Sequence, residues 1–125
     1  MAKLKPIQQQ LGRHAEDAAC AYLHDHGLQL VCRNFSCRSG EIDLVMLTHD
    51  TLVFVEVRYR SSGRFGGALA SITRSKQQKI INAARYFLHN HRQFADYAAR
   101  FDVVAIQSDD TGQRIDWIPA AFLAY

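Results

Sequence analysis

The stretch at residues 40–60, GEIDLVMLTHDTLVFVEVRYR, constrains the fold more than any other part of the sequence. Two runs rich in Val, Ile, Leu and Phe, at 40–47 and 51–60, flank a short polar segment, so the stretch predicts an antiparallel strand pair joined by a turn. Such a pair is suited to a hydrophobic core. Four charged residues nevertheless interrupt it: Glu41, Asp43, Glu56 and Arg58.

The register of this strand pair decides which charged side chains meet. Side chains alternate across a strand, so Glu56 and Arg58 share one face, about 7 Å apart. If Thr48 pairs with Thr51, Asp43 lies directly opposite Glu56, with Cβ atoms about 5 Å apart. A loop shorter by one residue would shift the register by one. Because like charges opposed on a sheet destabilise it, we expect compensation by a divalent cation, a raised pKa or a nearby cation.

Two interpretations of this charged cluster are open on spacing alone. Two carboxylates, a backbone carbonyl and water form a ligand set that suits Mg²⁺, and Arg58 lies close enough to stabilise charge that develops on a phosphate. Alternatively, the charges form a surface ladder of ion pairs, in which Glu41 faces Arg58 and Asp43 lies beside Arg60.

The other segments predict two helices and three further strands. Apolar residues recur at helical spacing over 8–26 and 73–90, and strand-like runs occupy 28–35, 100–106 and 114–118, where Pro119 is expected to end the last strand. The glycine-rich segment 61–68 predicts a mobile loop. The order α-β-β-β-α-β-β implies an α/β fold with a mixed sheet flanked by helices. The 125 residues, 1–125, suit one domain.

The basic residues are unevenly distributed along the chain. Between residues 57 and 95 there is no Asp or Glu, whereas the rest of the chain has 12 acidic residues against 7 basic ones. A block of one sign favours a surface that faces a polyanion, although a solvated basic helix face is the other interpretation. The block consists of Arg58, Arg60, Arg64, Arg74, Lys76, Lys79, Arg85 and Arg92.

The sequence also indicates a compartment. No apolar run approaches the roughly 20 residues of a membrane-spanning helix, and the N-terminus becomes polar too early for a secretory signal. The three cysteines, Cys20, Cys32 and Cys37, form no paired motif that would indicate zinc or a disulfide framework. We therefore expect a cytoplasmic protein.

Several motifs together resemble a known family. The pattern GEIDLV, a turn and then VFVEVR is similar to the core motif of PD-(D/E)xK nucleases. The chain further resembles the YraN-like bacterial family, a distant relative of archaeal Holliday junction resolvases. The resemblance spans nearly the whole chain in the order of the family and rests on Gly40-Glu41-Ile42-Asp43, Phe54-Val55-Glu56-Val57-Arg58, Phe65-Gly66, Ser75-Lys76-Gln77, Arg100-Phe101-Asp102 and Ala121-Phe122.

The resemblance implies a restriction-endonuclease-like core and a role for each matching residue. Asp43 and Glu56 would bind Mg²⁺ or Mn²⁺ together with the carbonyl of Val57. Glu16, on the first helix, matches an acid that such nucleases place beside the metal; an ordinary exposed helix acid is the alternative. At the start of the second helix, Lys76 and Gln77 match positions near the scissile phosphate, where the helix N-terminus also favours anions. A solvated first turn is the alternative there.

Arg58 departs from the PD-(D/E)xK core motif, which ends in lysine at this position. Arginine stays protonated in proteins, so Arg58 cannot act as a general base, although it can bind a phosphate. The resulting hypothesis is a Mg²⁺-dependent endonuclease acting on DNA, branched DNA included, as a homodimer by analogy with resolvases. Its DNA-binding residues would be Lys76, Gln77, Arg60, Arg64, Arg74 and Lys79. A DNA-binding module without cleavage, or a scaffold without a nucleic-acid role, is the alternative.

Overall fold

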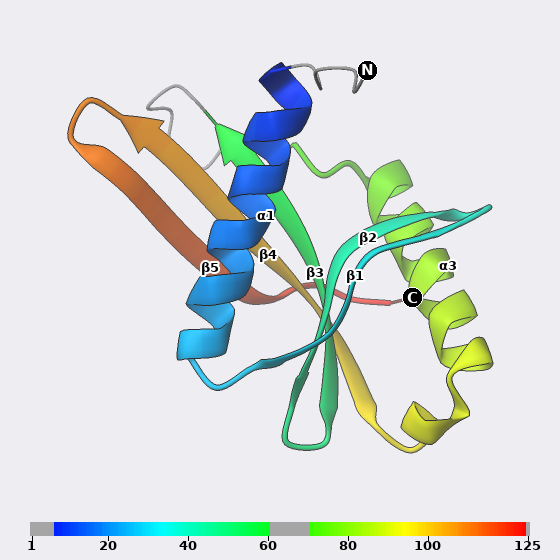
Figure 1. The fold of residues 1–125 in the computed structure, drawn as a ribbon. Coiled ribbons are helices and arrows are strands. Elements are labelled where there is room, and N and C mark those ends of the chain that lie inside the picture. Colours follow the sequence, from blue (N-terminus) through cyan, green and yellow to red (C-terminus); the bar gives the residue numbers. More distant parts are fainter. Residues whose placement is uncertain (1–6, 61–70, 125) are drawn as a thin grey trace, which may run out of the picture.

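The computed structural model describes residues 7–60 and 71–124, which form one sheet and its flanking helices (Figure 1). The elements follow the predicted order α-β-β-β-α-β-β, with a short 3-10 helix, η1, added after the second helix. In chain order they are α1 (Ile7–Asp25), β1 (Gln29–Cys37), β2 (Gly40–Thr48), β3 (Thr51–Arg60), α3 (Arg74–Asn90), η1 (Arg92–Phe94), β4 (Ala98–Asp109) and β5 (Gly112–Phe122).

The five strands form one mixed sheet, in the spatial order β1-β2-β3-β4-β5. Strands β1, β2 and β3 pair antiparallel, β3 and β4 pair parallel, and β4 and β5 pair antiparallel. The parallel pair needs a crossover, because its two strands run in the same direction, and the chain between them includes α3. The predicted α/β architecture is therefore confirmed.

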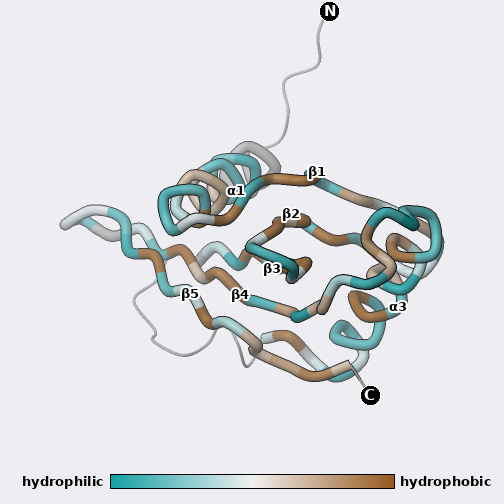
Figure 2. The backbone as a smooth tube through the Cα atoms, turned by 90° about the horizontal axis from the view of Figure 1, so that it is seen from below, coloured by the Kyte–Doolittle hydropathy of each residue, from teal (hydrophilic) through white to brown (hydrophobic). Residues whose placement is uncertain are grey.

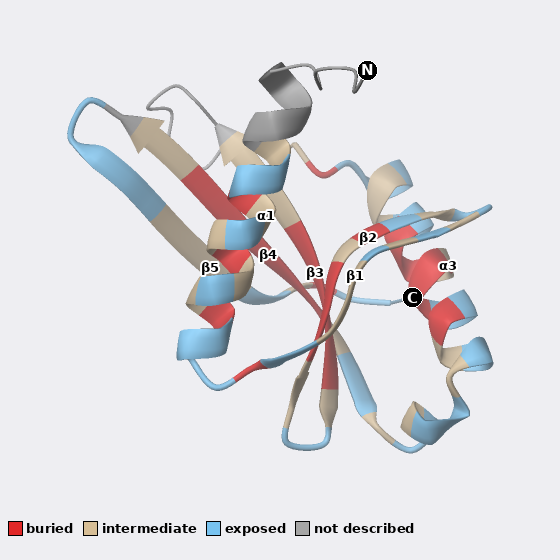
Figure 3. Cartoon of the chain, viewed as in Figure 1, coloured by how far each residue is buried: buried red, intermediate tan, exposed pale blue. Residues whose placement is uncertain are grey.

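The two helices cover opposite faces of the sheet, as Figure 2 shows. Ala15, Ala19 and Leu23 of α1 pack in one apolar cluster with Val53 and Val55 of β3. The other cluster joins α3 to the opposite face of β3; its members include Ile80, Ala84, Phe87, Leu52 and Phe54. The alternation predicted for β3 is thus observed, and Figure 3 shows its buried middle between half-buried ends.

The hairpin of β2 and β3 has the predicted register over part of its length. The ladder runs from Thr48↔Thr51 to Leu44↔Val55, as a pairing of Thr48 with Thr51 requires. The expected continuation to Asp43 opposite Glu56 is not part of this ladder. Strand β2 stays paired with β1 as far as Gly40, whereas its ladder with β3 ends at Leu44↔Val55, so the expected pairing of Glu41 with Arg58 is not observed either. Consequently, β2 and β3 separate at the charged residues.

The last strand continues beyond its predicted end. Strand β5 extends to Phe122, and Pro119 lies inside it rather than ending it. The β4–β5 register shifts between Phe101 and Val103, and Ala120 in this region has a φ of 50°. Proline is tolerated at a bulge, because a bulged residue need not donate to the ladder.

Two further observations concern the other predictions. Within the described residues, no helix is both long and apolar enough to cross a bilayer. The three cysteines are free thiols. The glycine-rich segment predicted at 61–68 lies outside the residues that the structure describes.

Candidate functional site

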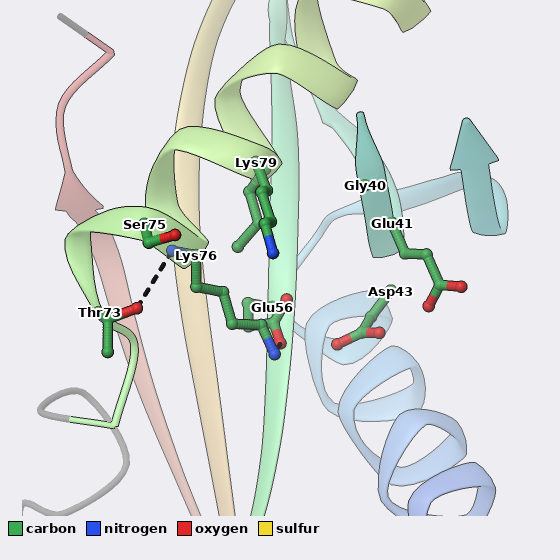
Figure 4. Close-up of a pocket in the computed structure, with 9 residues that line it drawn as sticks. Gly40, Glu41, Asp43, Glu56, Thr73, Ser75, Lys76 and Lys79 are labelled. Atoms are coloured by element: carbon green, nitrogen blue, oxygen red, sulfur yellow. Dashed lines mark hydrogen bonds and ion pairs between the residues drawn. The ribbon is translucent and has the colours of Figure 1, made fainter. Parts of the chain in front are cut away.

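A hollow opens where β2 and β3 separate, between these strands and the first turns of α3. Its volume is about 340 Å³, and Figure 4 shows acidic side chains from the two strands facing lysines from the helix. The hollow is lined by Gly40, Glu41, Asp43, Glu56, Thr73, Ser75, Lys76, Lys79 and Ile80. Two segments that are far apart in the sequence, the hairpin and the start of α3, thus contribute to one site.

Asp43 is the acidic residue at the point of separation. Its Oδ2 accepts a hydrogen bond of 2.8 Å from the backbone N–H of Val57, so the side chain, rather than a backbone carbonyl of β2, is the acceptor for this N–H of β3. Burial and then the nearby charge of Glu56 raise the pKa of Asp43 from 3.8 to about 7, against the lowering effect of the Val57 hydrogen bond. The backbone therefore fixes the position of the Asp43 carboxyl group, and its surroundings make it keep its proton to a higher pH than an ordinary aspartic acid does.

Glu56 is a buried acid on the α3 side of β3, with 7% of its surface exposed. Its Oε1 lies 3.4 Å from the Lys76 Nζ and 3.6 Å from the Arg58 Nε. Burial raises the pKa of Glu56 above its ordinary value, although the Lys76 and Arg58 charges act in the opposite direction. Glu56 therefore combines a buried position with two cationic neighbours.

Glu16 reaches the same region from α1. Its negative charge contributes to the raised pKa of Asp43 and of Glu56, although Glu16 is not among the residues that line the hollow. Arg33 of β1 holds this part of α1, since its Nη2 lies 3.7 Å from Glu16 and its Nη1 lies 2.6 Å from Asp17. Sequence reasoning missed Arg33; a cation inside the otherwise apolar strand run was the available signal.

The first turn of α3 is fixed by a side-chain cap. The Thr73 hydroxyl oxygen accepts a hydrogen bond of 3.2 Å from the Lys76 backbone N–H. This cap was overlooked, although a threonine directly before an apolar helical pattern is the usual signal. It fixes the backbone from which Lys76 and the neighbouring Ser75 reach the hollow.

The predicted DNA-binding residues do not all lie together. Lys76 and Lys79 line the hollow that contains the acids. Gln77 and Arg74 instead line a second hollow of about 540 Å³ on another side of α3, where Phe122 also lies, and the Gln77 Nε2 donates to the Ile72 carbonyl at 3.1 Å. The prediction grouped these four residues because they are close in sequence. Closeness in sequence does not show which way each side chain points from the helix. Arg64 and the side chain of Arg60 lie outside what the structure describes.

Gly40 allows β2 to approach α3 closely. A Cβ atom at this position would lie 3.0 Å from the Lys79 carbonyl oxygen and 3.2 Å from the Lys79 Cβ. Such distances are tighter than most Cβ contacts in proteins, so a larger residue would push strand and helix a few tenths of an ångström apart, and glycine permits their close approach. The glycine of the Gly40-Glu41-Ile42-Asp43 motif thereby allows β2 and α3, the two walls of the hollow, to lie close to each other.

The oxygen-rich donor set has consequences for metal binding. Carboxylate and carbonyl oxygens with water suit Mg²⁺, which needs few protein ligands. Among the described residues, no group of three or more His, Cys, Asp and Glu side chains is arranged to hold a metal ion. The protein ligands of a Mg²⁺ ion would thus be Asp43, Glu56 and a backbone carbonyl such as that of Val57. The alternative ion-pair ladder is wrong for Arg58, whose ion pair is with Glu56.

Comparisons with known proteins identify relatives over nearly the full chain. The chain is 54% identical over 114 residues to a UPF0102 protein of Stutzerimonas stutzeri, covering 91% of this chain and 95% of that protein. It is 50% identical to a UPF0102 protein of Pseudomonas putida, over 98% of both chains. A UPF0102 protein of Aeromonas hydrophila is also 50% identical, over 95% of this chain and 89% of its own.

The family match covers both walls of the hollow. It extends over residues 15–106, from Ala15 on α1 to Ile106 on β4, and includes Asp43, Glu56 and Lys76. The chain therefore belongs to the Uncharacterised protein family UPF0102, the YraN-like family that its sequence motifs resemble.

Proposed function

We propose that this chain is a Mg²⁺-dependent endonuclease-like phosphodiesterase that acts on DNA, branched DNA included, in the cytoplasm. One observation carries the proposal: Asp43 and Glu56 line the same hollow as Lys76 and Lys79, so a site for a cation and a site for a phosphate adjoin. The resemblance to PD-(D/E)xK nucleases supports the same conclusion. A branched substrate presents more than one strand for cleavage. The proposal therefore includes a homodimer, which would supply two copies of the site.

The acids of the hollow fit a divalent cation on electrostatic grounds. Burial raises the pKa of both Asp43 and Glu56, and the Glu56 charge further raises that of Asp43, so the charged pair is unfavourable without a counter-ion. Asp43, Glu56 and the Val57 carbonyl would hold Mg²⁺ or Mn²⁺, and Glu16 would add negative charge nearby. When bound, such an ion lowers the pKa of a coordinated water and neutralises charge on a phosphate.

The residues around the acids have separate roles in this proposal. Lys76 and Lys79, at the start of α3, would bind the phosphate backbone, and their contacts carry no sequence information. Arg58 stays protonated, so it would stabilise negative charge rather than accept a proton. Because Asp43 and Glu56 are on strands of one sheet, the acids are held by rigid elements rather than by a loop.

A second candidate is a DNA-binding module of the same fold without cleavage. Two cations, Arg58 and Lys76, lie against the same oxygen of Glu56, so this acid is already partly neutralised by the protein itself. Such a module would bind DNA through its basic residues without needing a divalent ion, and its affinity would fall as salt is added.

The deciding experiment compares wild type with Asp43→Asn on junction, flap and duplex DNA with Mg²⁺ or Mn²⁺. We expect cleavage by wild type only, and a metal-dependent rise in Tm in wild type only, because a ligand that binds the native state stabilises it. Asp50→Asn, in the exposed β2–β3 turn, is the matched control and should behave as wild type. Equal cleavage by wild type and Asp43→Asn would exclude the proposed site, and metal-independent DNA retention without cleavage would support the second candidate.

A further inference from the structure

Lys76 is the residue of the hollow whose position the proposed function does not explain. A lysine that only binds phosphate would extend into solvent, but the Lys76 Nζ lies 3.4 Å from the Glu56 Oε1. Figure 4 shows its side chain extending from α3 toward Glu56 across the hollow. The ammonium group therefore lies beside a carboxylate that would bind the divalent cation.

Arg58 and Lys76 differ in how they are attached, although both contact the Glu56 Oε1. Arg58 is on β3, two residues from Glu56, and its side chain is 23% exposed. Lys76 is on α3, across the hollow, and its side chain is 43% exposed. Its ammonium group is at the end of a flexible stem of four carbons. The Thr73 cap fixes the backbone of Lys76, so its side chain alone can move away from Glu56.

We propose that Lys76 is a tethered counter-cation of Glu56, which an entering divalent cation displaces and thereby frees to contact a nucleic-acid phosphate. The inference rests on the proposed function, since it concerns the same acids. A divalent cation that binds Glu56 repels the two protein cations already close to this carboxylate, Arg58 and Lys76. Lys76 is the more exposed and the more flexible of the two, so it is the one that leaves. The displaced ammonium remains within the hollow, since its backbone is fixed.

The exchange couples the two ligands of the site. A phosphate that attracts Lys76 removes a competitor from Glu56, so bound nucleic acid strengthens cation binding. By linkage, the cation strengthens nucleic-acid binding by the same factor. Replacing Lys76 by a neutral residue should therefore act in opposite directions on the two ligands: tighter cation binding and weaker DNA binding.

Lys79 provides the matched comparison. It is an exposed lysine on the same helix and lines the same hollow, whereas the ion pairs of Glu56 among the described residues are those with Lys76 and Arg58. Lys76→Met and Lys79→Met remove one positive charge each at similar side-chain volume. General electrostatics predicts similar effects of the two changes on cation binding, whereas a tethered counter-cation predicts a larger effect at Lys76.

The experiment titrates Mg²⁺, and separately Mn²⁺, into DNA-free protein by calorimetry. We expect Lys76→Met to bind the ion about two- to fivefold more tightly than wild type, the range of a partly exposed ion pair, and Lys79→Met to change less. Lys76→Arg keeps the cation and should bind the ion as wild type does. Lys76→Met should retain a labelled duplex more weakly than wild type does, and the difference should be larger with Mg²⁺ than in EDTA, because the ion frees the wild-type ammonium from Glu56.

The possible failures are distinguishable. If wild type binds Mg²⁺ and cleaves DNA, but Lys76→Met binds the ion no more tightly than Lys79→Met, the counter-cation role is wrong and the proposed function stands. If neither wild type nor Lys76→Met binds Mg²⁺ or Mn²⁺, both proposals fail. Ion binding by Lys76→Met alone would support the counter-cation and would show that Lys76 blocks the wild-type site. Thermal unfolding of each variant in EDTA verifies that it is folded.

Discussion

At the scale of single residues, Asp43 does two things that a strand residue seldom combines. It supplies a hydrogen-bond acceptor to the Val57 backbone N–H, and it places a second carboxyl group beside Glu56. Asparagine would keep the acceptor without the charge, whereas alanine would remove both. The two substitutions therefore separate the structural contribution of Asp43 from the electrostatic one.

The first prediction concerns Asp43→Asn and pH. The pKa of Asp43 is about 7 in the native state against 3.8 ordinarily, so the native state retains a proton that the unfolded chain releases. This contribution to the free energy of unfolding is fully present below about pH 4 and is lost as pH rises through about 7. We expect Asp43→Asn to depend less steeply on pH and to exceed wild type in stability at pH 8 in EDTA.

Urea unfolding between pH 5 and 8 measures this difference. Asp43→Ala is the comparison: it leaves the Val57 N–H without its acceptor and should be about 1–3 kcal/mol less stable than Asp43→Asn. Parallel pH profiles for wild type and Asp43→Asn would contradict the raised pKa. Equal stability of the alanine and asparagine variants would contradict the structural role of the hydrogen bond.

The same hairpin shows which contacts of single residues the sequence could predict. Alternation and turn length correctly gave the register from Thr48 to Leu44 and the shared face of Glu56 and Arg58. They could not give the separation of the strands at Asp43, because it depends on the path of β1 and on α3. Local pattern carries no information on such distant neighbours.

At the scale of elements, Asp102 joins β4 to the irregular part of β5. This fully buried carboxylate accepts hydrogen bonds of 2.9 Å from the Trp117 Nε1 and the Ala120 backbone N–H, and it pairs with Arg100 at 3.1 Å. The sequence singled out Arg100-Phe101-Asp102 as a family motif without giving it a role. Its role in the fold is to satisfy the donors of the bulge that lets β5 continue past Pro119.

The second prediction is that Asp102→Ala destabilises the fold by about 3–5 kcal/mol, because it leaves buried donors and the partly buried Arg100 without their partner. Asp116→Ala is a matched control, since Arg114 and Asp116 have the same spacing on β5 and lie 3.3 Å apart, but Asp116 is 38% exposed. The control should lose at most about 1 kcal/mol. Chemical denaturation measures both; equal losses would contradict the structural role of Asp102.

The third prediction concerns the contact between β2 and α3. Gly40→Ala adds a methyl group 3.0 Å from the Lys79 carbonyl oxygen, so the strand and the helix have to move apart. We expect a loss of about 1–3 kcal/mol and weaker binding of Mg²⁺, since the walls of the hollow separate.

Gly12→Ala is the control for this prediction. A Cβ atom at Gly12, in α1, would have no neighbour within 4 Å, and alanine favours a helix over glycine. This variant should gain about 0.5–1 kcal/mol. A stabilising effect of Gly40→Ala would show that the contact between strand and helix is not close.

At the scale of the whole molecule, the basic block is divided by α3. The sequence showed a segment without acids from 57 to 95, but charge counts could not show that Lys76 and Lys79 lie with the acids of one hollow while Arg74 lines another. The fold class was predictable, because element order and hydrophobic period fix it. The division of the charges depends on how α3 is rotated against the sheet, which only packing determines.

The last prediction uses this division to test whether the hollow binds the DNA backbone. Each phosphate contact that is lost lowers the slope of log affinity against log salt by about one. Lys76→Gln with Lys79→Gln should therefore weaken duplex binding and lower the slope by about one to two in EDTA, where Lys76 is still paired with Glu56. Arg13→Gln with Arg92→Gln removes the same net charge at exposed positions on α1 and η1, outside both hollows, and should leave the slope nearly unchanged. Fluorescence anisotropy at several salt concentrations in EDTA measures both slopes. Equal slopes for the two double variants would mean that net charge, rather than this hollow, determines binding. No measurable binding by wild type would favour a scaffold without a nucleic-acid role.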